Sequence, residues 1–532
     1  MKATMLFILL LATQAWGQNV ETPSGPVHGQ IATYRNVSYY TYLGVPYAKV
    51  DVHNPFGASQ PYPNFDTPFN ATDHTVKCPQ VALTPGGITQ CLRLNIFTPV
   101  TASPKNLLPV FVWFHGGGFF FGNSGDYDGR YFMQHDIIVV AANYRLGPYG
   151  FFCLDDPHIP GNQGLKDQID ALRWVKKNIG AFGGDASKVT IGGESYGGGS
   201  VDLHVYSLYE KLFDKAIVQS GTLHAEAIFV KPDYNAPIKL AAYLGHNTTN
   251  NKEALEFLAK EDPIKVVTAQ MSMSLLLRAC KEKKYKGVQN FIASDPFHLQ
   301  NSQKVKDMSI LFGYNSKETF GAVANIPDSV FDDAKNIFTD KINSTFVLRK
   351  HELHVLANNV KKFYIGGKDV SKESMLALVD FTADYTLNYG AERSVDDYVK
   401  QGVGKVYKYL FSYTKGSPYE NITGVGAYHT EELQYLFYMG TELKTEQIGM
   451  MDKLTKLWSD FIKYGNPTPS QSLLDVPTWI PVTNGTARPY MNIDSTMEMK
   501  ADVYHERIAF WDMIWHHHWR KSAILVDRNH HD

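Results

Sequence analysis

The chain reads Val189-Thr190-Ile191-Gly192-Gly193-Glu194-Ser195-Tyr196-Gly197-Gly198-Gly199-Ser200 where a short apolar run meets a serine between glycines. Its middle fits the pattern Gly-x-Ser-x-Gly of a nucleophile elbow, a sharp turn from a strand into a helix. Glycines allow such a turn and close packing around it, so that the serine hydroxyl is presented to the site. The pattern also fits a glycine-rich loop with an inert serine, and the surrounding sequence must separate the two.

Short β-branched and aromatic runs alternate with helical patterns along the chain, which is typical of a sheet covered by helices. A helix is predicted over residues 162–179, because Leu165, Ile169, Leu172 and Val175 fall on one face. We predict an α/β fold with a large, mixed, mostly parallel twisted sheet and helices on both faces. The strands are expected at residues 108–114, 137–143, 189–191, 216–219, 308–313 and 406–413.

A run of glycines directly follows the predicted strand at residues 108–114, in His115-Gly116-Gly117-Gly118. Glycines at this place leave their backbone N–H groups unobstructed. Together with the N–H of Tyr196, they would stabilise the negative oxygen that develops during acyl transfer. A tight turn without catalytic function is the alternative. Two such motifs, both at strand ends, favour a catalytic site.

A serine hydroxyl needs a base to remove its proton, and the base needs a carboxylate that fixes its orientation. In a fold of this kind the order along the chain is serine, acid, histidine. Glu318 follows the predicted strand at residues 308–313, and His429 follows that at residues 406–413. The chain has 19 histidines, so spacing alone leaves an ordinary surface loop open for either residue.

Together these residues resemble the type-B carboxylesterase/lipase family, which has the α/β-hydrolase fold and also contains the cholinesterases. The similarity extends over nearly the whole chain after residue 17. The resemblance implies Ser195 as nucleophile, His429 as its base and Glu318 as the acid that orients the base. Its further motifs are Tyr42-Leu43-Gly44-Val45-Pro46-Tyr47-Ala48, Cys91-Leu92-Arg93-Leu94-Asn95-Ile96, Asn143-Tyr144-Arg145-Leu146-Gly147, Gly161-Asn162-Gln163-Gly164-Leu165-Lys166-Asp167-Gln168, Phe182-Gly183-Gly184-Asp185, Gln219-Ser220-Gly221 and Trp458-Ser459-Asp460-Phe461.

The resemblance also implies an oxyanion hole formed by the backbone N–H groups of Gly117, Gly118 and Tyr196. The family usually has alanine after the nucleophile, whereas this chain has the bulky Tyr196. The backbone N–H of a tyrosine can still donate, but its ring must be accommodated beside the substrate. We therefore expect Tyr196 to narrow or reshape the pocket for the acyl group.

The 4 cysteines bear on the cellular compartment and on the kind of esterase. Cys78 and Cys91 enclose a short loop rich in Pro and Gly that suits an extracellular disulfide, and the resemblance implies the same pair. This loop lacks the tryptophan that binds the cation of choline in cholinesterases, so a carboxylesterase of another kind is expected. Cys153 and Cys280 lie far apart and are interpreted as free and structural, with a second disulfide left open.

The first residues indicate export from the cell. A basic residue, an apolar run and a small-x-small cleavage site are typical of a signal peptide over residues 1–17. One domain is expected at residues 18–520, followed by a flexible tail at residues 521–532 that is neither a retention signal nor an apolar anchor. We expect a secreted protein without a membrane anchor. Six sequons are candidate glycosylation sites, at Asn36, Asn70, Asn247, Asn343, Asn421 and Asn484.

The composition also restricts the kinds of molecule that we expect the protein to bind. A formal net charge of −2 gives no field that would attract nucleic acid or an acidic membrane, so neither is expected as a partner. No cysteine spacing is typical of a zinc site, and we expect neither a metal nor a cofactor. Two conspicuous patterns have plain interpretations. His516-His517-His518 is interpreted as a solvated helix end, and Lys281-Glu282-Lys283-Lys284 as an exposed charged face.

We predict a serine hydrolase that acts on small to medium carboxylic esters through an acyl-enzyme. A non-catalytic adhesion or binding protein on the same fold is one alternative, but such relatives typically lose residues of the triad, which are all present here. A serine carboxypeptidase is another, because Glu-Ser-Tyr recurs around its nucleophile. The glycine run at His115-Gly116-Gly117-Gly118 and a glutamate as the acid favour the esterase.

Overall fold

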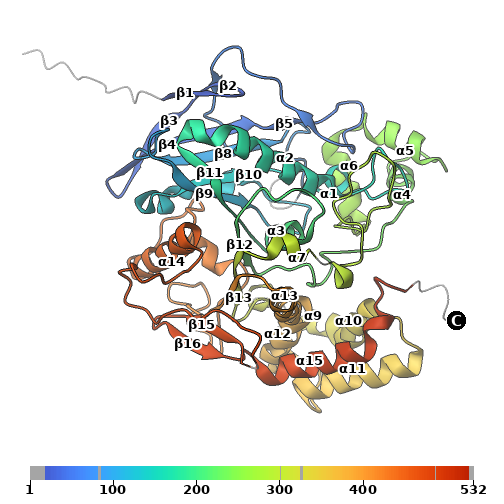
Figure 1. Cartoon of the computed structure of the whole chain (residues 1–532). Coiled ribbons are helices and arrows are strands. Elements are labelled where there is room, and N and C mark those ends of the chain that lie inside the picture. The colour runs from blue at the N-terminus through green and yellow to red at the C-terminus, as the bar shows by residue number, and fades with distance from the viewer. Residues whose placement is uncertain (1–17, 82–84, 300, 324–327, 486, 527–532) are drawn as a thin grey trace, which may run out of the picture.

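The computed structural model describes residues 18–81, 85–299, 301–323, 328–485 and 487–526. In this part of the chain one sheet of 11 strands forms the centre of the molecule (Figure 1). From one edge to the other its strands are β16 (Glu498–Ala501), β15 (Pro489–Ile493), β14 (Lys405–Phe411), β13 (Ser309–Asn315), β12 (Lys215–Gln219), β11 (Gly184–Glu194), β9 (Leu108–Phe114), β10 (Ile138–Ala142), β8 (Arg93–Pro99), β4 (Val37–Pro46) and β3 (Gln30–Tyr34).

The strands from β15 to β10 run parallel, and antiparallel strands complete both edges. This is the mixed, mostly parallel sheet that the sequence predicts. Every predicted strand is present within a few residues, but β11 is longer than the predicted run at residues 189–191. It continues through Gly192, where a Cβ would lie 2.4 Å from the ring of Phe111, so glycine lets this ring cover the strand. Smaller strands are β1 (Asn19–Thr22), β2 (Gly25–His28), β5 (Ala48–Lys49), β6 (Gln60–Pro61) and β7 (Phe69–Asn70).

Alternate residues of the central strand β9 face opposite sides of the sheet, as the pleat requires. Val112 belongs to the core that includes helices α2 (Gln163–Asn178) and α3 (Tyr196–Tyr206). Trp113 belongs to a second core, which includes helix α14 (Thr445–Tyr464). Helices therefore cover both faces, and the predicted helix at residues 162–179 is α2.

A third apolar cluster lies among the helices in the lower right of Figure 1. It is formed by side chains from α10 (Ile337–Thr345), α11 (Lys350–Ile365), α12 (Met375–Ala383), α13 (Tyr389–Lys400) and α15 (His505–His518). The remaining helices are α1 (Gly147–Phe151), α4 (Ala236–Tyr243), α5 (Asn251–Leu258), α6 (Pro263–Ser272), α7 (Ser302–Val305), α8 (Phe320–Val323) and α9 (Asp328–Asp333). In the described residues, none of these helices combines the length and apolar character that crossing a membrane requires.

A second disulfide joins Cys153 to Cys280, so the interpretation of these residues as free cysteines is wrong. The two segments are brought together by Asn162, whose side chain donates to the carbonyl of Cys280 at 2.8 Å and accepts from its N–H at 3.0 Å. The side chain of Asn162 also donates to Glu282 at 2.7 Å. Glu282 is only 2% exposed, so the predicted exposed face at residues 281–284 is wrong at this position. The second disulfide and the burial of Glu282 both involve contacts between residues more than 110 positions apart, which local sequence patterns do not indicate.

The first residues of the expected tail contact the segment that follows α10. The carbonyl of Lys521 accepts from Val347 N–H at 2.7 Å, and Ala523 N–H donates to the carbonyl of Thr345 at 2.8 Å. These backbone hydrogen bonds join residues 521 and 523 to the end of α10 and the residues after it. The flexibility of the tail stays a prediction. The expected signal peptide, residues 1–17, lies outside the described residues, as do residues 527–532.

Loop length ranks the two disulfides in their effect on stability. Cys153–Cys280 spans 127 residues and Cys78–Cys91 spans 13. In the chain-entropy model, replacing the first pair with alanine lowers the free energy of unfolding by about 5 kcal/mol, and replacing the second pair by about 3 kcal/mol. Chemical denaturation of the two double variants measures both losses. Equal losses, or a greater loss at Cys78–Cys91, would contradict the ranking.

Candidate active site

Ser195 lies at the turn between β11 and α3, with φ of 58° and ψ of −126°. Its backbone N–H donates to the carbonyl of Gln219 at 2.9 Å, which ties the turn to the next strand. A Cβ on Gly197 would lie 2.1 Å from the carbonyl oxygen of Phe114, and one on Gly221 would lie 1.7 Å from that of Ser195. Only glycine fits at these two positions. The predicted strand-to-helix turn is therefore present.

His429 and Glu318 are in direct contact although 111 positions separate them in the sequence. His429 Nδ1 lies 2.6 Å from Glu318 Oε2, and the backbone N–H of His429 donates to the carbonyl of Glu318 at 3.0 Å. The other carboxylate oxygen, Oε1, accepts from the Ser220 hydroxyl and from the backbone N–H of Asn315, both at 2.7 Å. The carboxylate is thus fixed, and it holds the imidazole with the proton on Nδ1.

The opposite ring nitrogen of His429 faces Glu194, the residue before the serine. His429 Nε2 lies 3.2 Å from Glu194 Oε1. Within the part of the chain that the structure describes, the Ser195 hydroxyl makes no hydrogen bond, so a direct bond to His429 is not formed. Ser195 and His429 nevertheless line the same two cavities. Catalytic hydrogen bonds are often absent or long without substrate and tighten when it binds.

Carboxylates determine the charge of His429. Burial acts to lower the pKa of His429, but the negative charges of Glu194 and Glu318 outweigh it and raise this pKa above its ordinary value. Burial raises the pKa of the Glu194 carboxyl, and the positive charge of His429 opposes this rise. Burial also raises the pKa of Glu432, which accepts from Gln219 Nε2 at 2.9 Å behind the site. The imidazole is therefore surrounded by groups that favour its protonated form.

The glycine loop, residues 115–122, passes directly beside the nucleophile. A Cβ on Gly116 would lie 3.0 Å from the Cβ of Ser195. Gly117 and Gly118 have φ of 97° and 67°, which glycine adopts without strain. Among the described residues, the backbone N–H groups of Gly117, Gly118 and Tyr196 have no acceptor. Tyr196 is the first residue of α3, where a helix leaves its N–H groups unpaired.

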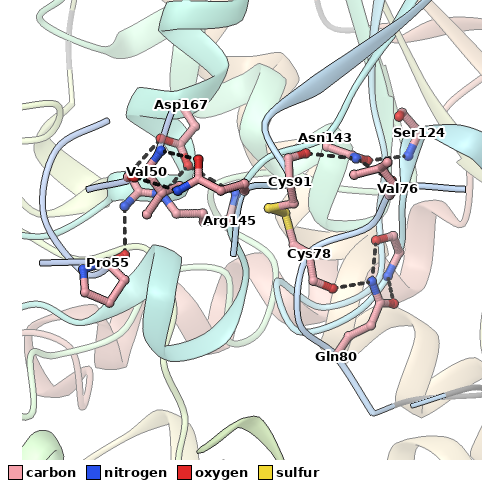
Figure 2. Close-up of a disulfide and its surroundings, with 12 residues drawn as sticks. Val50, Pro55, Val76, Cys78, Gln80, Cys91, Ser124, Asn143, Arg145 and Asp167 are labelled. Atoms are coloured by element: carbon pink, nitrogen blue, oxygen red, sulfur yellow. Dashed lines mark hydrogen bonds and ion pairs between the residues drawn. A yellow bond between two sulfur atoms is a disulfide. The ribbon is translucent and has the colours of Figure 1, made fainter. Parts of the chain in front are cut away.

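The disulfide Cys78–Cys91, which the sequence predicts, is tied to the glycine loop by Gln80 (Figure 2). Gln80 Nε2 donates to the carbonyls of Cys78 and Gly122, both at 3.0 Å, and Gln80 Oε1 accepts from the Gly122 N–H at 2.9 Å. The disulfide therefore helps to position the loop beside the nucleophile. Sequence reasoning assigned no role to Gln80 or to Glu194, although Glu194 lies within the elbow motif itself.

A buried ion pair supports the same side of the site (Figure 2). Arg145 donates to both oxygens of Asp167 at 2.7 Å and to the carbonyls of Pro55 and Gly57 at 3.0 and 2.6 Å. Both charged side chains are almost fully buried. The pair connects the loop after β10 to α2 and to the N-terminal part of the chain.

His115 fixes the start of the glycine loop. Its ring stacks on that of Tyr144 with centroids 4.4 Å apart, and its Nδ1 lies 2.8 Å from the carbonyl oxygen of Gly116. Burial lowers the pKa of His115 to about 4. The ring is therefore neutral at pH 7, and its Nδ1–H donates to the carbonyl of Gly116.

Two cavities meet at Ser195. The larger, of about 1320 Å³, is bordered by the glycine loop, and the smaller, of about 740 Å³, lies toward Ser220 and Tyr428. Tyr196 lines both cavities, and its ring packs edge-on against Phe119 with centroids 5.0 Å apart. The effect of Tyr196 on acyl preference stays a prediction.

The fold and the surroundings of Ser195 define the class first: the chain is a serine hydrolase with the α/β-hydrolase architecture. Comparison with known proteins then gives the family. The model of the carboxylesterase family matches residues 17–511. The chain therefore belongs to the carboxylesterase family.

Individual relatives agree with this assignment. The chain is 30% identical to Esterase E4 of Myzus persicae over 508 residues, which cover 88% of this chain and 90% of the relative. It is 29% identical to juvenile hormone esterase of Tribolium castaneum over 555 residues, which cover 92% and 93% of the two chains. The crystal structure of juvenile hormone esterase from Manduca sexta, with OTFP covalently attached, matches with a TM-score of 0.81 at 25% identity and covers 94% of this chain and 100% of that one. These relatives are esterases and not cholinesterases, as the sequence predicts.

Burial of neutral His115 makes stability depend on pH. The unfolded chain takes up a proton at this residue below about pH 6.5, whereas the folded chain does not until about pH 4. The stability that this group contributes is therefore lost as the pH falls from about 6.5 to 4. We expect His115→Gln to reduce the pH slope of the unfolding free energy in this window by up to about 1.4 kcal/mol per pH unit. Chemical denaturation at several pH values measures the slope, and parallel profiles for the two proteins would contradict the assignment.

Proposed function

We propose that this carboxylesterase hydrolyses small to medium esters through a covalent acyl-enzyme on Ser195, with His429 as general base and Glu318 orienting the base. The observation that carries the proposal is the 2.6 Å contact of Glu318 with His429, beside two cavities that Ser195 also lines. The contact leaves Nε2 of the imidazole directed toward the elbow. No step of this mechanism requires a metal or a cofactor.

Acyl transfer proceeds in two similar halves. His429 takes the proton of the Ser195 hydroxyl while the serine oxygen attacks the ester carbonyl carbon, and the backbone N–H groups of Gly117, Gly118 and Tyr196 stabilise the resulting oxyanion. The tetrahedral intermediate collapses, and the alcohol leaves with the proton from His429. Water then attacks the acyl-enzyme with the same help and releases the acid and the free serine.

Secretion as a glycoprotein is part of the proposal. The signal-peptide pattern of residues 1–17 motivates it, and the two disulfides suit an oxidising compartment. All six sequon asparagines are exposed, which a glycosylation site requires. They are Asn36, Asn70, Asn247, Asn343, Asn421 and Asn484.

Replacing the nucleophile tests the reaction class. We expect Ser195→Ala to lower kcat on a simple aryl ester by about 10⁴ to 10⁶-fold, because the oxyanion hole and substrate binding alone give little rate. Steady-state assays of wild type and variant measure this loss. A blocked dipeptide assayed beside the ester separates an esterase from a carboxypeptidase. Turnover by the variant at the wild-type rate would reject the proposed nucleophile.

Removing the charge of Glu194 tests the electrostatics of the base. His429 must be neutral to accept the serine proton, and the Glu194 carboxylate raises the pKa of His429. Glu194→Gln should lower this pKa, so that the acidic limb of the kcat/KM profile moves to lower pH. The pH profile of aryl ester hydrolysis measures the shift. The conservative variant Glu194→Asp is the control, and a limb that moves to higher pH in Glu194→Gln would contradict the interpretation.

A further inference from the structure

Among the residues that the structure describes, Arg278 is a buried cation without an anionic partner. The residue is 6% exposed, and its Nη1 donates to the carbonyl of the preceding Leu277, at 2.9 Å. Its Nε is buried and has no hydrogen-bond partner within the described ranges of the chain. In the part of the chain that the structure describes, Arg278 forms no salt bridge with any carboxylate. Proteins rarely bury a guanidinium in this way, because desolvating an unpaired charge costs much of its interaction with water.

The guanidinium lies over two aromatic rings that border the site. Its Cζ is 5.3 Å from the ring centroid of Tyr196 and 5.2 Å from that of Phe120. Arg278 lines the cavity of about 740 Å³ that Ser195 and His429 also border. Contact with ring faces holds a cation in place but does not use its N–H donors. The donors that face the cavity and are not paired with a described residue are therefore available to a molecule bound there.

The acidic residues on the wall of the same cavity are already paired. Glu226 accepts from Lys341 through both carboxylate oxygens at 3.0 Å. Glu318 is held by His429, Ser220 and Asn315, as described above. Neither carboxylate provides the negative charge that Arg278 lacks. A bound ligand can provide it.

We propose that Arg278 binds a carboxylate carried by the ester substrate, so that the enzyme prefers esters with one free carboxylate near the scissile bond. The proposal rests on the proposed acyl-transfer function of the same site. The planar guanidinium presents paired N–H donors that match the two oxygens of a carboxylate. The cavity joins Arg278 to Ser195, so one substrate can reach both. The carboxylate belongs either to the acyl group or to the alcohol.

Matched pairs of substrates test the preference in both arrangements. For the acyl side, mono(4-nitrophenyl) glutarate is compared with 4-nitrophenyl pentanoate, and for the alcohol side, 4-acetoxybenzoate with 4-methylphenyl acetate. The readout is the ratio of kcat/KM for the charged ester to that for its neutral partner. In Arg278→Met we expect this ratio to fall by about 10 to 100-fold for one of the two pairs, since hydrogen bonds to a charged group are lost. The pair that responds identifies the side of the ester that carries the carboxylate.

Lys281→Met is the matched control. Lys281 is about half exposed and lies near Asp295, at 3.5 Å, so its loss removes one positive charge close by in the sequence but outside the cavity. We expect this variant to keep the wild-type ratio for both pairs. If the ratio fell as much in Lys281→Met as in Arg278→Met, the effect would come from the overall charge of the protein, and the proposal would be overturned.

Stability separates recognition of a ligand from a structural role. A buried cation that serves the substrate does not help folding, so Arg278→Met should unfold at the same or a higher temperature than the wild type. Ratios that stay the same as in the wild type for both ester pairs would overturn the proposal, and so would a clear fall in the unfolding temperature. If the wild type hydrolyses none of the four esters, the proposed function itself fails, and the Ser195→Ala comparison shows this independently.

Discussion

The contact between His429 and Glu318 is the interaction on which the site depends. The sheet brings these two residues together. Strands β13 and β14 are parallel neighbours, with Asn315 paired to Phe411, so the loops after them leave the sheet at the same edge. Beyond the strands, the N–H of Ser316 still donates to the carbonyl of Phe411 at 2.9 Å. The two loops are thus kept together until they deliver the glutamate and the histidine. The elbow after β11 adds the serine at the same edge.

The surroundings of the site hold features that do not favour folding by themselves. Three carboxylates, those of Glu194, Glu318 and Glu432, are buried close together, and burial raises the pKa of Glu194. Ser195 is held at positive φ, and Arg278 is buried without a carboxylate partner among the described residues. Such features concentrate where the surrounding structure serves chemistry rather than stability. The rest of the molecule, with two disulfides and large cores on both sheet faces, holds them in place.

Local patterns predicted the sheet and the elbow, because each follows from a strand and the residues after it. They left Glu318 and His429 open, and the resemblance to the carboxylesterase family assigned their roles. The polar contacts that Asn162 makes with distant segments were not predicted. Asn162 lies near Cys153 in the sequence and makes hydrogen bonds to both Cys280 and Glu282, each more than 110 residues away. A run of lysines around one glutamate carries no sign of such a partner. Long-range pairing of polar side chains leaves no periodicity in the sequence.

The sequence also did not predict how the side chains are oriented within the site. The elbow motif predicts where Ser195 lies, but not that Nε2 of His429 faces Glu194 at 3.2 Å while the serine hydroxyl is unbonded among the described residues. This arrangement follows from charge, since a buried carboxylate attracts an imidazole that tends to be protonated. A neutral ester carbonyl bound against the glycine loop is expected to bring the serine and the imidazole together.

A crystal structure of the enzyme inhibited by a phosphonylating reagent tests the central claim most directly. The phosphorus should be bonded to Ser195 Oγ, with its free oxygen at about 3 Å from the backbone nitrogens of Gly117, Gly118 and Tyr196. His429 Nε2 should then point toward the adduct. An adduct on another residue, or a phosphonyl oxygen directed away from these three N–H groups, would contradict the account.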